Sequence, residues 1–262
     1  MAASLVLSSA VALAVLLLAG GGGGGEGPAS SEPAPPSAGP AGTTYYVSPQ
    51  GSDEADGRSP GSAWATVERL HDVRLRPGDR VLFRGGATFD AEVRLSASGT
   101  AGARIVYGSY GDGRARFTRS IFLDEASWIV IQDLELAGAE QGIASLGSRE
   151  TGARGNRIRG FPGGSAVSVR RHDSRIEDNE IDGGLVGISW FQEDSGTGTS
   201  RWRDNRISGT TDAGIYVSPS DAAGQTRESF VITGNVLSPT RGRHMNLAPS
   251  AGRYTVARNV ER

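Results

Sequence analysis

The sequence contains no cysteine, and its 27 basic residues are all arginine, so lysine is missing as well. Without cysteine there are no disulfides, no thiolate catalysis and no cysteine-based metal sites. Without lysine there is no lysine general base and no Schiff base. Imidazole can come only from His71, His172 and His244. The formal net charge of −2 leaves no basic excess, so we expect no nucleic-acid partner.

Glycine is abundant, at 39 of 262 residues, whereas hydrophobic residues make up only 37%. This composition favours a fold with many turns and a narrow core over a large helical one.

The N-terminal region has the composition of a leader followed by a tether. An apolar run covers Leu5 to Ala19, which is shorter than the roughly 20 residues that a membrane span needs. We therefore predict a signal peptide at 1–19 and a secreted, cell-surface or periplasmic location in a bacterium. The alternative is an uncleaved N-terminal anchor, which would be the only contact with a membrane. Residues 20–42 are rich in Gly, Pro and Ser and predict a disordered linker before a folded domain at 43–262.

An internal repeat decides the predicted fold. Segments similar to IEDNEIDG recur roughly every 22–30 residues, and one position in them is occupied by Leu134, Asn156, Asn179, Asn205, Asn235 and Asn259. A second apolar alternation follows in each repeat, at 141–145, 166–170, 186–190, 214–218 and 244–248. Alternation this short is typical of strands.

These strands predict an all-β fold, a single-stranded right-handed parallel β-helix in which the asparagines form a ladder at one turn. A leucine-rich repeat would need a Leu-dominated frame, but the inward positions here are Ile, Val and Trp. The β-helix is therefore the better interpretation.

The two ends of the predicted β-helix differ. A short amphipathic helix near Ala65–His71, with Val67 and Leu70 on its apolar side, is predicted to cap the first coil. At the other end the last repeat stops at Arg262 with no capping segment after it. We expect either a C-terminally truncated chain or a coil that is capped by association, and the oligomeric state is left open.

The opening block carries a family resemblance. YYVSPQGSDEADGRSPGSAWATVERL, then RPGDRVLFRGGATF, then coils of the NxI type, resembles the bacterial secreted right-handed parallel β-helix repeat proteins of the pectate-lyase-like superfamily. The resemblance covers about residues 43–262. It implies a polysaccharide ligand or substrate and, in members that act as lyases, a lysine base and Ca²⁺ held by clustered carboxylates. This chain has neither the lysine nor an obvious carboxylate cluster, so Ca²⁺ is only implied by the resemblance and no metal ligand is assigned.

The resemblance further implies that the strand after the variable turn forms the sugar-binding face. The outward positions of these strands and the adjoining loops supply the candidate residues. The candidate catalytic residues are His244, Arg243, Arg170, His172, Glu193 and Asp221, and the candidate substrate-binding residues are Tyr216, Arg171, Asn246 and Arg241.

One chemistry open to this set is β-elimination on a uronate. His172 or His244 would abstract the proton, and Arg170 or Arg243 would neutralise the developing charge through its planar fork. The stretch RRHDSR is, however, more typical of a solvated turn with local ion pairs.

The other chemistry is glycoside hydrolysis by paired carboxylates such as Glu193 and Asp221, with Tyr216 as a stacking platform. The sequence thus predicts an exported carbohydrate-active protein, a polysaccharide lyase or glycoside hydrolase if it is an enzyme. The alternatives are a non-catalytic glycan-binding or surface β-helix and a truncated inactive relic.

Overall fold

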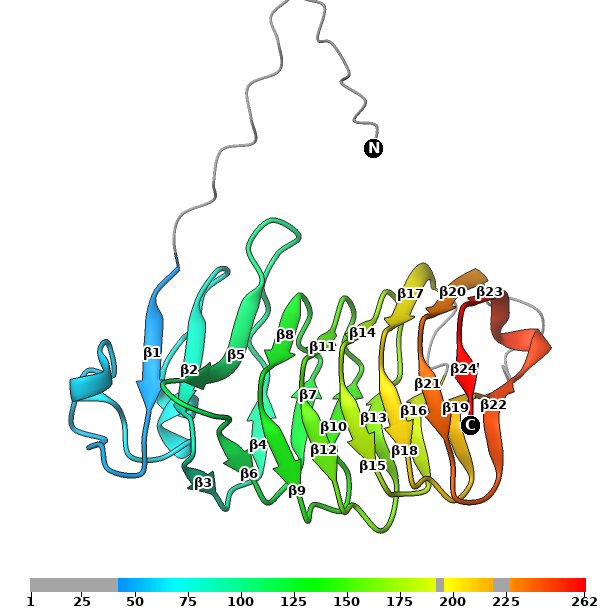
Figure 1. Ribbon diagram of the computed structural model, residues 1–262. Helices are drawn as coiled ribbons and strands as arrows, with labels where there is room; N and C mark the ends of the chain where they lie inside the picture. Colours follow the sequence, from blue (N-terminus) through cyan, green and yellow to red (C-terminus); the bar gives the residue numbers. More distant parts are fainter. Residues whose placement is uncertain (1–41, 192–195, 219–226) are drawn as a thin grey trace, which may run out of the picture. The chain divides into compact units, whose positions relative to one another are not determined.

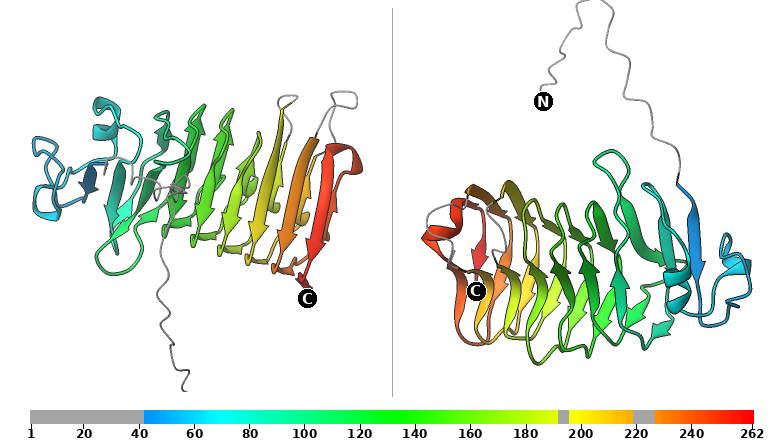
Figure 2. Two further views of the ribbon diagram at one scale, coloured as in Figure 1. Left: turned by 90° about the horizontal axis from the view of Figure 1, so that it is seen from above. Right: turned by 180° about the vertical axis from the view of Figure 1, so that it is seen from behind.

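The computed structural model describes residues 42–191, 196–218 and 227–262, all within one compact unit, Ala38–Arg262. The chain winds into a right-handed parallel β-helix whose coils stack side by side from β1 to β24 (Figure 1). Successive coils add strands to three sheets, here called A, B and C, in which neighbouring strands pair in parallel (Figure 2). The predicted all-β solenoid is confirmed. The division into leader, linker and domain stays a prediction, because residues 1–41 lie outside the described part.

From β2 onward, each sheet takes every third strand of the chain, and β1 adds one more strand to sheet A. Sheet A contains β1 (Thr44–Val47), β2 (Arg80–Arg84), β5 (Ile105–Tyr110), β8 (Ile129–Gln132), β11 (Gly152–Arg154), β14 (Arg175–Glu177), β17 (Thr197–Arg203), β20 (Arg227–Thr233) and β23 (Gly252–Ala257). Sheet B contains β3 (Thr88–Phe89), β6 (Arg116–Phe117), β9 (Glu135–Ala137), β12 (Arg157–Arg159), β15 (Glu180–Asp182), β18 (Arg206–Ser208), β21 (Val236–Ser238) and β24 (Val260–Glu261). Sheet C contains β4 (Val93–Leu95), β7 (Ile121–Asp124), β10 (Ile143–Leu146), β13 (Ser165–Val169), β16 (Val186–Trp190), β19 (Ala213–Val217) and β22 (Arg243–Leu247).

The core is a column of apolar side chains inside the coils. In sheet B, for example, Ile158, Ile181 and Ile207 share one register and are almost completely buried. Burying an aliphatic side chain of this size contributes about 1.5–3 kcal/mol. Trp190 and Trp202 also lie in the core, as predicted.

The predicted asparagine ladder is present at the turn between sheets A and B. The carboxamide oxygen of Asn179 accepts hydrogen bonds from Asn156 N at 2.9 Å and Asn156 Nδ2 at 3.1 Å. Asn179 N and Nδ2 in turn donate to Asn205 Oδ1. The left-handed backbone conformation falls on the residue before the asparagine, such as Asp178 with φ 57°, because the asparagine side chain points inward to its neighbours.

Helix is limited to three 3-10 segments in the described ranges, η1 (Pro60–Ser62), η2 (Glu68–Asp72) and η3 (Pro249–Ala251). The helix predicted near Ala65–His71 is thus a shorter 3-10 turn, although Val67 and Leu70 are both buried in the core. Its role as a cap stays a prediction. None of the described helices is long and apolar enough to cross a membrane.

Candidate functional site

The outer face of sheet C carries the strand positions that the sequence predicted to face outward. Ser168, Ser189, Tyr216 and Asn246 lie side by side in one register. Ser168 and Ser189 are nevertheless only 8% and 0% exposed, so they offer no open surface. Tyr216 and Asn246 are half-buried, and the Tyr216 ring lies 5.8 Å from that of Phe191.

His172 does not lie in an open groove. Its side chain is 1% exposed, and its Nδ1 lies 2.8 Å from Oε2 of Glu228, which is fully buried. Ser200 Oγ donates to the other Glu228 oxygen at 2.7 Å. The prediction of an exposed base or a solvated turn is wrong for His172, because the side chain turns inward at the corner between sheets C and A.

His244 was predicted to point outward from sheet C, and this is also wrong. Its Nε2 lies 3.2 Å from the carbonyl oxygen of Arg262, and its Nδ1 lies 3.6 Å from the Glu261 carboxylate, next to sheet B. Gly214 occupies the position equivalent to His244 on the preceding coil. A Cβ added to Gly214 would lie 3.4 Å from the Leu237 side chain of sheet B. A Cβ in this column is directed toward sheet B, so a strict alternation assigns it to the wrong side.

The remaining predicted residues are dispersed. Arg170, Arg241 and Arg243 are exposed, and Arg171 is half-buried. Glu193 and Asp221 lie outside the described residues. The buried His172 thus does not share a surface with the exposed Arg170, and the catalytic assignment stays a prediction.

Arg171 does line a hollow of about 460 Å³ where sheet C turns toward sheet A. Asp124, Glu125, Leu146 and Gly147 form the rest of its wall.

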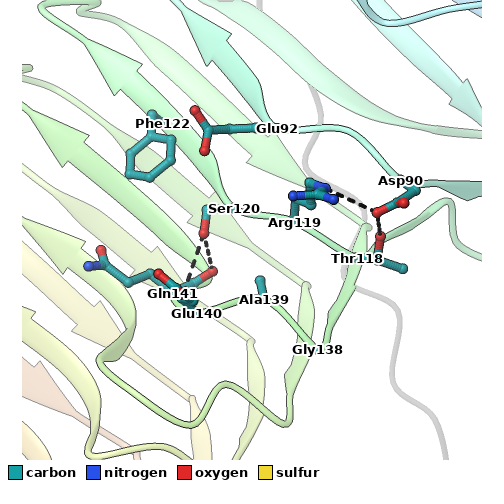
Figure 3. Close-up of a pocket in the computed structure, with 10 residues that line it drawn as sticks. All are labelled: Asp90, Glu92, Thr118, Arg119, Ser120, Phe122, Gly138, Ala139, Glu140 and Gln141. Carbon is teal, nitrogen blue, oxygen red and sulfur yellow. Dashed lines mark hydrogen bonds and ion pairs between the residues drawn. The ribbon is translucent and has the colours of Figure 1, made fainter.

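A second hollow of about 450 Å³ lies where sheet B turns into sheet C, at the start of β4, β7 and β10 (Figure 3). Its wall includes the carboxylates of Asp90, Glu92 and Glu140. Asp90 accepts hydrogen bonds from Thr118 Oγ1 at 2.6 Å and from Arg119 Nε at 3.1 Å, which are drawn in Figure 3. The hydrogen bond from Thr118, supported by the Arg119 charge, lowers the pKa of Asp90.

The two hollows flank one group of side chains, which we call the Arg94 platform: Glu92, Arg94, Phe122 and Asp124. The Arg94 guanidinium lies over the Phe122 ring, 4.6 Å from its centroid. Its Nε donates to Glu92 at 2.8 Å and its Nη1 to Asp124 at 3.2 Å. The hydrogen bond to Asp124 is the main cause that raises the Arg94 pKa.

Phe122 lines the hollow of Figure 3 and Asp124 lines the other. Residues two apart on a strand share a face and are about 7 Å apart, so the platform joins the two hollows across β7.

Sequence reasoning placed the candidate site on later coils and missed this platform. The only signal was the alternation in VRL and IFLD, which leaves Arg94 and Phe122 as the outward residues of two strands. Their proximity depends on the register between β4 and β7, which no local pattern states.

Comparison with known proteins places the chain in a family. A protein-family model described as "Periplasmic copper-binding protein (NosD)" matches residues 96–259, well over half of the chain. The chain belongs to the NosD family. That description agrees with the secreted or periplasmic location predicted from the N-terminal segment.

Several solved structures are similar to the chain at low identity. A rhamnogalacturonan lyase is 13% identical, with 83% of this chain and 87% of that chain covered and a TM-score of 0.45. A pectate lyase is 13% identical, with 78% of each chain covered and a TM-score of 0.45. A GH136 lacto-N-biosidase from Eubacterium ramulus is 13% identical, with 83% and 67% covered and a TM-score of 0.44. No curated protein matches the chain.

The described residues do not form a copper site. Copper(I) prefers thiolate and thioether ligands and copper(II) prefers imidazole, but the chain has no cysteine, two methionines and three histidines. His172 is held by Glu228, and His71 and His244 lie in η2 and β22. Within the described ranges, no three His, Cys, Asp or Glu side chains come together to hold a metal ion.

Proposed function

We propose that this NosD-family chain is an exported glycan-binding β-helix that holds a neutral polysaccharide at the Arg94 platform without cleaving it. The observation that carries the proposal is the arrangement of Arg94, fixed over Phe122 by Glu92 and Asp124 between two hollows. A planar guanidinium beside fixed carboxylates presents both donors and acceptors, and sugar hydroxyl groups act as both.

The charges around the platform favour a neutral glycan over a polyuronate. The platform and its two hollows contain five carboxylates and three arginines, which are Asp90, Glu92, Asp124, Glu125 and Glu140, and Arg94, Arg119 and Arg171. The excess of negative charge would repel a polyuronate chain, because like charges in proximity cost free energy.

Binding without cleavage is supported by the state of the acidic groups. Acid-catalysed hydrolysis needs a carboxyl group whose pKa is raised so that it carries a proton. At this site the pKa of Asp90 is lowered instead, and Arg94 pairs with both Glu92 and Asp124. Elimination needs a base beside the sugar, and His172 is buried away from the surface. Cleavage by Glu193 and Asp221 remains the alternative hypothesis.

The proposal is tested by affinity electrophoresis of the full chain in gels that contain neutral, uronate-rich or no polysaccharide. We expect retardation by a neutral glycan. The Arg94→Ala variant should bind about 10–100-fold more weakly, because a charge-assisted hydrogen bond contributes about 1.5–3 kcal/mol. Arg175→Ala is the matched control, since Arg175 is an exposed arginine on sheet A with no ion pair in the described part.

Parallel assays for unsaturated products and for new reducing ends separate binding from cleavage. Product formation would favour the enzyme hypothesis and contradict the proposal. Equal retardation of wild type and Arg94→Ala would show that the glycan binds elsewhere.

A further inference from the structure

A separate hollow of about 520 Å³ lies at the first coil, beside the 3-10 segment η2. Four arginines, Arg58, Arg69, Arg74 and Arg76, line it together with three aspartates. Its lining residues all precede the Arg94 platform in the sequence, and it has the opposite excess of charge.

The aspartates in this hollow already have partners. Asp79 is almost fully buried, and its two oxygens accept hydrogen bonds from Thr43 N and Arg76 N, each at 2.7 Å. Asp56 accepts hydrogen bonds from Ser62 Oγ at 2.7 Å and from a backbone N–H at 3.0 Å.

One arginine is fixed as part of the wall. Arg69 Nη1 lies 3.0 Å from Asp72 Oδ2, and its guanidinium lies 5.8 Å from the centroid of the buried Trp64 ring. Arg69 Nε is itself buried and makes no hydrogen bond within the described residues. Trp64 is held in turn by a hydrogen bond from its Nε1 to the carbonyl oxygen of Ala55 at 3.0 Å.

The other three arginines carry free donors. Within the part of the chain that the structure describes, the guanidinium groups of Arg58, Arg74 and Arg76 make no hydrogen bond and no ion pair. The four arginines of this hollow outnumber its three aspartates by one charge, so an anion placed among the guanidinium groups would be attracted.

We propose that this hollow binds a ligand through an oxyanion, either the carboxylate of a sugar acid or a phosphate group. The arginine fork matches both groups in a bidentate manner. The volume lies within the range of about 300–1,000 Å³ typical of small-ligand sites. The site is independent of the Arg94 platform, so either can exist without the other.

The test is isothermal titration calorimetry of the full chain with digalacturonate, with inorganic phosphate and with neutral galactobiose. We expect one of the two anions to bind, and any heat from galactobiose, which would come from the Arg94 platform, to be the same in the double variant described below. Tighter binding of digalacturonate identifies a sugar acid as the ligand, and tighter binding of phosphate identifies a phosphorylated one.

The Arg74→Gln/Arg76→Gln double variant should weaken anion binding at least tenfold. The matched control is Arg175→Gln/Arg206→Gln, which removes the same charge from exposed arginines on sheets A and B that have no ion pair in the described ranges. Circular dichroism checks that both variants fold. Binding of neither anion, or an equal loss in the control, would overturn the proposal.

Discussion

Replacing Glu228 with alanine would remove the acceptor at the centre of a buried polar network. Its carboxylate receives His172 Nδ1 at 2.8 Å, Ser200 Oγ at 2.7 Å and the backbone N–H of Asp173 at 3.3 Å. His172, Ser200 and Glu228 are each no more than 1% exposed. A buried donor that loses its partner costs about 1–3 kcal/mol, and breaking a buried pair by removing one member can cost about 3–5 kcal/mol. We therefore expect Glu228→Ala to lower the free energy of unfolding by about 3–6 kcal/mol.

Urea unfolding followed by tryptophan fluorescence measures this loss, because Trp190 and Trp202 lie in the same region of the core. Glu177→Ala is the matched control. Glu177 also lies on sheet A, but its ion pair with Arg203 is long at 3.4 Å and partly exposed, so the change should cost less than about 1 kcal/mol. If Glu228→Ala unfolded like the wild type and lost a polysaccharide-cleaving activity instead, the network would be catalytic and the structural reasoning would be refuted.

Three further outcomes follow from particular residues. Asn179→Ala should lower the free energy of unfolding, measured in urea, by about 2–4 kcal/mol. The loss should exceed that of Asn259→Ala, because Asn179 is buried between two ladder neighbours and Asn259 is only partly buried. Equal losses would contradict the role of the ladder. Glycan affinity, measured in titrations at several pH values, should stay constant from pH 8 to about pH 5, because the lowered pKa of Asp90 keeps its carboxylate ionised over this range. A fall in affinity centred near pH 6.5 would indicate a histidine instead. Gly184→Ala should lower the unfolding midpoint strongly, since the φ of Gly184 is +85° and an added Cβ would lie 1.9 Å from the buried Phe161 ring. Gly163→Ala is the control and should leave the midpoint unchanged, because an added Cβ there has open space.

The NosD family description raises copper binding as a further test. Because the described residues offer no cluster of ligands, equilibrium dialysis of the full chain against copper should detect no tightly held ion. Retention of one copper per chain that His172→Ala leaves unchanged would point to ligands outside the described ranges.

The sequence by itself determined the architecture. The burial of alternate residues repeats along the coils, and an asparagine recurs at the same turn from Asn156 onward. A pattern of a few residues is therefore enough to reveal both the strands and the ladder. The absence of cysteine and lysine likewise excludes thiolate and lysine chemistry from composition alone.

Only the tertiary structure decided which surface can act. His172 is buried where the chain turns between sheets C and A, and the His244 ring lies beside Glu261 and Arg262, so strict alternation predicts the side of neither residue. Arg94 and Phe122 meet although they belong to different coils, because the parallel register between β4 and β7 sets them side by side. In a solenoid, local sequence specifies each coil, but a site is assembled from several coils, and the stacking register that brings them together is a property of the folded chain.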